Sequence, residues 1–143
     1  MISEYRRMGN RGNLAEAFRT EVGVEFAFLV EHIGFSGPVQ TDSGFLFHGA
    51  GLDVEVWFLD VHEPVVTTLV APVASDGVRA RGVWLDELYV LSGCGPAQDV
   101  PGWAPTRRAV LKRVRQHAAA LSRLMPQLLT AEGAQLIARS RQG

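Results

Sequence analysis

Two periodicities in the apolar positions divide this chain into a helical first part, a β-rich middle and a helical last part. Between residues 14 and 33 apolar side chains recur every three or four positions, which predicts one amphipathic helix. Asn13 followed by Glu16 forms a capping-box pattern that predicts the start of this helix, and Gly34 suits its C-terminal end. Residues 1–12 are polar and are expected to form a flexible leader. The predicted buried stripe comprises Leu14, Phe18, Val22, Phe26, Leu29 and Ile33.

In the middle of the chain the apolar period falls to two, which is typical of strands with one buried face. β-Branched residues are concentrated in the same region. The connecting turns are too short for a parallel crossover, so the strands are expected to pair as antiparallel hairpins. Residues 52–59 carry the alternation, residues 45–48 form a short apolar run and residues 65–71 are β-branched and apolar. Together with residues 81–84 they give four candidate strands.

Helical periodicity returns toward the C-terminus. A short helix is expected from residue 85, and a loop rich in Gly and Pro over residues 92–105 precedes a long helix capped by Thr106. Pro126 is expected to kink that helix or to start a new turn near its end, and residues 131–139 are expected to form a last short helix.

Together these elements predict a single α+β domain over residues 13–143. Its architecture is a two-layer sandwich: an antiparallel sheet of about four strands forms a meander, and two long helices pack on one face. With 143 residues, of which 47% are apolar, the chain is long enough to bury one core.

Composition narrows the class of protein. The single cysteine excludes an intrachain disulfide and a thiolate zinc cluster, and it favours a reducing compartment. The sequence contains neither a signal-peptide pattern nor an apolar segment long enough for a membrane span. Thirteen of the 14 basic residues are Arg, a bias typical of high-GC bacterial genes. We therefore expect a soluble bacterial protein of the cytoplasm.

The formal net charge of −1 conceals an uneven distribution along the chain. Residues 12–105 contain 13 acidic and three basic residues, a net charge of −10. Residues 106–143 contain eight basic residues and one acidic residue, a net charge of +7. This pattern predicts a dipolar domain with an acidic sheet and a basic C-terminal helix.

The acidic part suggests a contact surface for a protein partner. Asp53, Glu55 and Trp57 alternate on one side of a predicted strand, and Asp60 and Glu63 follow at its end. Exposed tryptophans mark contact surfaces, and acidic rows attract basic partners. We predict that these five residues face solvent and bind a basic protein. The alternative is that Trp57 is an edge residue covered by the leader or by the loop over residues 92–105.

Two other functions remain open at this point. Arg108, Lys112 and Arg115 lie on the polar side of the last long helix and could contact nucleic-acid phosphates, although amide and aromatic side chains that read bases are missing from this face. A ligand pocket could also lie under the 92–105 loop, lined by Cys94, Trp103 and a histidine.

Enzymatic chemistry has little support in the sequence. No nucleophile elbow, P-loop, dinucleotide fingerprint or zinc-protease motif is present. His48 and His62 flank neighbouring strands near Asp60 and Glu63, but turn and strand-end roles are commoner than metal binding for such residues. We predict no catalytic residues, no metal and no cofactor.

The arrangement of apolar positions resembles that of small bacterial α+β immunity proteins encoded beside polymorphic toxins. The resemblance spans residues 13–129 and rests on a pattern of apolar positions rather than on catalytic motifs. It implies a stoichiometric protein-binding role, in which the chain blocks a toxin domain and performs no chemistry, and it transfers no site residue. The segments that carry it are residues 25–35, 52–56, 83–88 and 106–129.

Overall fold

A computed structural model describes residues 2–49 and 51–142, with side chains from residue 12 onward. Five antiparallel strands form one sheet in the order β1-β2-β3-β4-β5. Four α-helices accompany the sheet, so the predicted α+β class and meander are confirmed. The strands are β1 (Ser36–Gln40), β2 (Gly44–His48), β3 (Leu52–Asp60), β4 (Pro64–Pro72) and β5 (Val83–Trp84).

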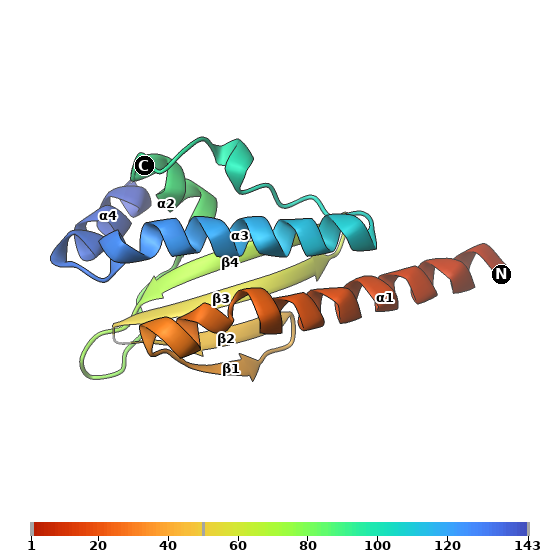
Figure 1. Cartoon of the computed structure of the whole chain (residues 1–143), viewed down its shortest axis with the longest axis horizontal. Coiled ribbons are helices and arrows are strands. Elements are labelled where there is room, and N and C mark those ends of the chain that lie inside the picture. The colour runs from red at the N-terminus through yellow and green to blue at the C-terminus, as the bar shows by residue number, and fades with distance from the viewer. Residues whose placement is uncertain (1, 50, 143) are drawn as a thin grey trace.

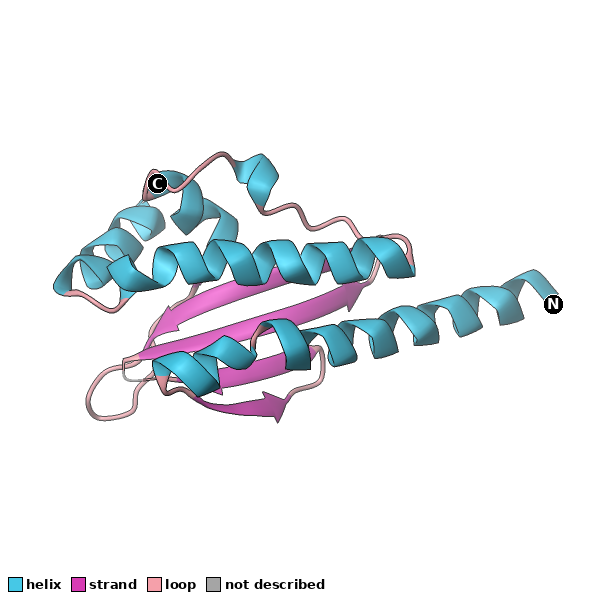
Figure 2. Ribbon diagram, in the orientation of Figure 1, coloured by secondary structure: helices cyan, strands magenta, loops and turns pink. Residues whose placement is uncertain are grey.

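The two long helices, α1 (Ile2–Glu25) and α3 (Arg107–Leu128), lie side by side across the same face of the sheet (Figure 1). The shorter helices, α2 (Leu85–Leu91) and α4 (Ala131–Gln142), gather at one end of that layer (Figure 2). The prediction of two long helices packed on one face is thus confirmed. Within the described part of the chain, no helix is both long and apolar enough to cross a bilayer.

The first helix begins earlier than its sequence pattern suggested. α1 starts at Ile2, so residues 2–12 belong to the helix, and Asn13 is an interior helical residue rather than an N-cap. The predicted helix start at Asn13 is therefore wrong. The other end agrees with the prediction: a single π-helical turn, Leu29–Ile33, follows α1 and ends at Gly34, whose φ of 93° is left-handed.

One strand, β1, was not predicted. All five of its residues are exposed, and it contains a glycine and Pro38, so it shows no apolar alternation. β1 is an edge strand that pairs only with β2, and an edge position tolerates a proline because one side of the strand needs no hydrogen bonds.

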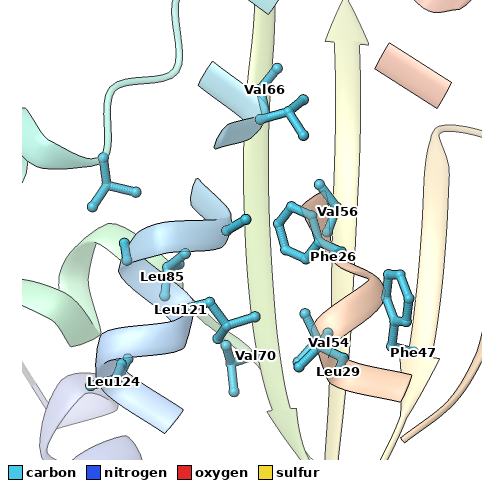
Figure 3. Close-up of a cluster of buried hydrophobic side chains, with 14 of the residues drawn as sticks. Phe26, Leu29, Phe47, Val54, Val56, Val66, Val70, Leu85, Leu121 and Leu124 are labelled. Atoms are coloured by element: carbon cyan, nitrogen blue, oxygen red, sulfur yellow. The ribbon is translucent and has the colours of Figure 1, made fainter. Parts of the chain in front are cut away.

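The core lies between the sheet and the two long helices. Side chains from the inner sides of β3 and β4 meet those of α1, its π-helical extension and α3, and Phe47 closes the layer from β2 (Figure 3). The predicted stripe of α1 is buried along its length, with Ile33 half-buried at the end. The labelled core residues are Phe26, Leu29, Phe47, Val54, Val56, Val66, Val70, Leu85, Leu121 and Leu124.

The long C-terminal helix follows its sequence pattern closely. Thr106 caps α3, since its side-chain oxygen accepts a hydrogen bond from the Ala109 amide at 3.1 Å. Pro126 lies within the last turn of α3 and does not end the helix, which continues to Leu128. The final helix was also predicted correctly, as α4.

Candidate protein-interaction face

The face of the sheet opposite α1 and α3 is called the outer face here. Side chains alternate along a strand, so the neighbours of the buried Val54 and Val56 point to this face. Strand register extends it across the sheet, because residues directly opposite each other share a face. Its strand residues are Ser36, Val39, Gly44, Leu46, His48, Asp53, Glu55, Trp57, Leu59, Val65, Thr67, Leu69, Ala71 and Trp84.

The two carboxylates at the centre of the outer face are not free in solvent. Asp53 is 6% and Glu55 8% exposed. Arg79 forms an ion pair with Glu55 and lies 3.9 Å from Asp53, and His48 Nδ1 donates to Asp53 Oδ1 at 2.8 Å. The prediction of a solvent-facing acidic row is therefore wrong, because Arg79 reaches over the sheet from the loop between β4 and β5, pairs with Glu55 and approaches Asp53.

Trp57 belongs to the same network. Its indole Nε1 donates a hydrogen bond to Glu55 Oε2 at 2.6 Å, and its ring meets Trp84 edge-on, with 5.7 Å between the ring centroids. Trp57 is half-buried in this setting, whereas Trp84 remains 37% exposed. The hydrogen bond fixes the orientation of Trp57, and Trp57 in turn supports the exposed ring of Trp84.

Trp103 reaches the outer face from the loop that precedes α3. The backbone of Trp103 forms an isolated antiparallel bridge with Val65 of β4. Because paired residues share a face of the sheet, the Trp103 side chain lies on the same face as that of Val65. The Val66 amide donates to the Gly102 carbonyl at 2.8 Å, and a Cβ at Gly102 would lie 2.9 Å from the Val66 carbonyl oxygen. Glycine therefore permits the close approach that positions Trp103, which is 57% exposed.

All three tryptophans of the chain consequently share the outer face. They form a band beside β4, and aliphatic side chains lie around them. Of the three, sequence reasoning placed only Trp57 on this face. Trp84 opposes Leu69 in the strand register, which no local pattern reveals, and Trp103 lies in what looked like an unstructured loop.

Two of the five predicted contact residues lie elsewhere. Asp60 is an even-numbered residue of β3, so it falls on the side of Phe58 and of the helices rather than on the outer face. Glu63 is exposed in the turn that joins β3 to β4. The structure thus brings together Asp53, Glu55 and Trp57 and separates the other two.

The loop over residues 92–105 packs against the domain, and the pocket of about 250 Å³ that its Gln98 and Asp99 line includes neither Cys94, Trp103 nor a histidine. Buried His117 of α3 anchors it: Nε2 donates to the Pro101 carbonyl at 2.9 Å, so Nδ1 accepts from the Thr68 hydroxyl, also at 2.9 Å. Burial lowers the pKa of His117 to about 4 and keeps the ring neutral. The predicted convergence of Cys94, Trp103 and a histidine is wrong, because each makes separate contacts.

Cys94 lies at the other end of this loop, near the C-terminal part of α3. Its sulfur is 3.9 Å from the side-chain nitrogen of Gln127. The neighbouring Tyr89 hydroxyl donates to Asp99 at 2.9 Å and accepts from Arg123 at the same distance. Trp103 is on the outer face of the sheet, so Cys94 and Trp103 cannot line one site.

The charge separation along the chain is partly cancelled in space, because α3 lies beside α1. Arg115 Nε is 3.0 Å from a Glu21 carboxylate oxygen and 3.8 Å from one of Glu25. Partial burial and then the hydrogen bond and charge of Glu21 raise the pKa of Glu25, while Arg115 acts in the opposite direction. Of the three predicted phosphate contacts, Arg115 is engaged within the fold, and Arg108 and Lys112 are exposed. The dipolar description is therefore too simple.

Metal-ligating residues do not gather at any one point of the described chain: no group of three or more His, Cys, Asp or Glu side chains has the required proximity. His48 contacts the buried Asp53, and His62 is exposed in the turn after β3.

Replacing Arg79 by Ala is expected to lower the free energy of unfolding by about 1–2 kcal/mol, because the buried Glu55 loses a charge-assisted hydrogen bond. Chemical denaturation measures this loss. Arg81→Ala is the matched control in the same loop, because only the backbone carbonyl of Arg81 makes a hydrogen bond, with Arg141. We expect the control to change stability by less than about 0.5 kcal/mol. Equal losses in both variants would contradict the role of Arg79.

No family model, no curated protein and no solved structure matches this chain.

Proposed function

We propose that the chain is a non-enzymatic protein-binding module that holds its partner on the outer face. The observation that carries this proposal is the position of the three tryptophans, which share the one sheet face opposite the two long helices. Trp84 and Trp103 are substantially exposed there, although each has a large apolar ring. Exposed tryptophan clusters of this kind are typical of the energetic centres of protein interfaces.

The polar centre of the outer face favours the same function. Glu55 holds Trp57 by a hydrogen bond, and Arg79 pairs with Glu55 from the other side. A surface whose rings are held before binding loses less conformational entropy when a partner arrives. Aromatic side chains held in this way provide contact area, while the paired charges at the centre limit which partner surfaces fit.

The particular role we propose is that of an immunity-like protein, which neutralises a toxin by stoichiometric binding in the bacterial cytoplasm. The support for this role is the sequence resemblance together with the outer face. The expected partner changes in one respect from the sequence-based hypothesis. Because Arg79 already pairs with the two carboxylates, the contact depends on apolar burial more than on attraction of a basic surface.

The test is binding to the product of the neighbouring gene. Replacing Trp84 and Trp103 together by Ala is expected to weaken binding at least about 100-fold, because each buried tryptophan at an interface centre contributes about 2 kcal/mol or more. Isothermal titration calorimetry measures the dissociation constant, and circular dichroism verifies folding. Leu129→Ala is the control, since Leu129 is an exposed apolar residue beyond the end of α3.

Unchanged binding by the double variant would refute the outer face as the binding surface. Charge reversal of Asp53 and Glu55 is a poor test, because both side chains are buried and their reversal would disturb the fold. Salt provides a better one: raising it from about 50 to about 300 mM should change the affinity only a few-fold if the carboxylates are already paired.

A further inference from the structure

We infer that, before its partner binds, the free chain covers the outer face with a second copy of itself. This inference rests on the proposed function to the extent that both use the same face. An aromatic face left in water favours association. The charge of this face, its area and the distribution of its large and small side chains point to a second copy as the occupant.

The first observation is the charge of the face. Arg79 contacts both carboxylates, and His48 donates to Asp53, so the charged groups at the centre are paired within one copy. One guanidinium serves two carboxylates, so the centre keeps a formal charge of −1 in place of the −2 of a bare acidic pair, and two copies brought face to face oppose less like charge than an unpaired acidic row would. Homodimer interfaces are more apolar than other protein interfaces, which agrees with a face of tryptophan and aliphatic side chains around a centre whose carboxylates are already engaged.

The second observation is the area of the face. The longest strands, β3 and β4, have nine residues each and span about 30 Å, and four spacings between five strands span about 19 Å. The rectangle with these sides covers about 570 Å², which is an upper limit for the flat footprint because β1, β2 and β5 are shorter, and the protruding rings add to it. A standard interface covers about 800 Å² on each partner, so the face is large enough for a weak dimer but not for a permanent one.

The third observation is the distribution of large and small side chains. Trp84 and Trp103 lie on the β5 side of the sheet, whereas Leu46 and Val39 occupy the β1–β2 side. A two-fold axis parallel to the strands would place the tryptophan side of each copy against the aliphatic side of the other. Both contacts then repeat by symmetry, as a closed dimer requires, and the two sheets form a sandwich about 10 Å apart.

Sedimentation velocity over a concentration series tests the inference. We expect a monomer–dimer equilibrium with a dissociation constant on the order of 10 µM, in keeping with the modest footprint. Trp103→Glu should make the chain monomeric across the series, because it would bury a charge in the interface. Leu129→Glu is the matched control and should dimerise normally, since Leu129 is about as exposed (51% against 57%) and lies off the face.

A second measurement needs no variant. All three tryptophans belong to the face, so dilution through the transition should shift the tryptophan emission to the red as the rings become hydrated. A monomer at every concentration, or a dimer that Leu129→Glu abolishes and Trp103→Glu does not, would overturn the inference. A monomer that still binds its partner through Trp84 and Trp103 overturns the dimer and leaves the proposed function intact. A dimer that depends on Trp103, in a chain that binds no partner, supports the inference and overturns the proposed function.

Discussion

Lowering the pH from 7 to 4 is expected to reduce the free energy of unfolding by about 3 kcal/mol through His117 alone. Burial holds the pKa of this ring at about 4, whereas the same ring in the unfolded chain titrates near its ordinary 6.5. Between these two values the unfolded state binds a proton that the folded state does not. Stability contributed by His117 is therefore complete above pH 6.5 and is lost as the pH falls to about 4.

The measurement is the free energy of unfolding by urea at a series of pH values. His117→Gln keeps one donor and one acceptor near Pro101 and Thr68 but does not titrate. The free energy of unfolding of this variant should therefore fall less steeply between pH 6.5 and 4 than that of the wild type, by the His117 contribution. His62→Gln is the matched control, because His62 is exposed, and it should leave the slope unchanged. An unchanged slope in His117→Gln would show that the ring is protonated or hydrated in the folded protein.

This histidine also links the two sides of the molecule. His117 joins α3 to Thr68 of β4 and to the Pro101 carbonyl, two residues before Trp103. The loop that presents Trp103 on the outer face is therefore held from within the core. Loss of His117 should affect binding by the outer face as well as stability, since an exposed ring contributes to binding only when its backbone is fixed.

Sequence periodicity predicted the elements that have one buried side and one polar side. α3 and β3 follow this rule, whereas β2 and β4 were predicted from short apolar and β-branched runs, and each of the four was predicted within a few residues. β1 departs from it because all of its residues are exposed, so it has no apolar alternation to detect. The prediction that the first helix starts at Asn13 was wrong for a related reason. The capping pattern is local, whereas the helix extends N-terminally beyond it to Ile2.

The outer face was predicted in position but not in chemistry. Alternation along β3 correctly separated Asp53, Glu55 and Trp57 from the core, and the same alternation, applied further, would have assigned Asp60 to the opposite side. The role of Arg79 was not predictable, because it lies 24 residues after Glu55 in a loop without a pattern of its own. Net charge along a sequence is therefore a poor guide to the charge of a surface.

The largest single loss of stability is expected from Phe26→Ala, at about 3–5 kcal/mol. Phe26 is fully buried where α1 gives way to the π-helical turn, and its ring stacks on Phe47 of β2 with 6.1 Å between centroids. Phe28 contacts the same ring from the helix side, at 6.4 Å. Truncation would lose the favourable free energy of burying the ring. It would also leave a cavity between the sheet and the helices, and the strands are too rigid to close that cavity.

Urea denaturation measures the loss, with Phe26→Leu as a graded variant that should lose about half as much, because Leu retains most of the apolar volume. Val24→Ala is the control on the same helix: Val24 is exposed, and alanine favours a helix, so stability should stay within about 0.5 kcal/mol of the wild type. A loss below about 1 kcal/mol in Phe26→Ala would mean that α1 does not close the core at this point. The outer face depends on that closure, because the sheet that carries its tryptophans gains its rigidity from the helices packed behind it.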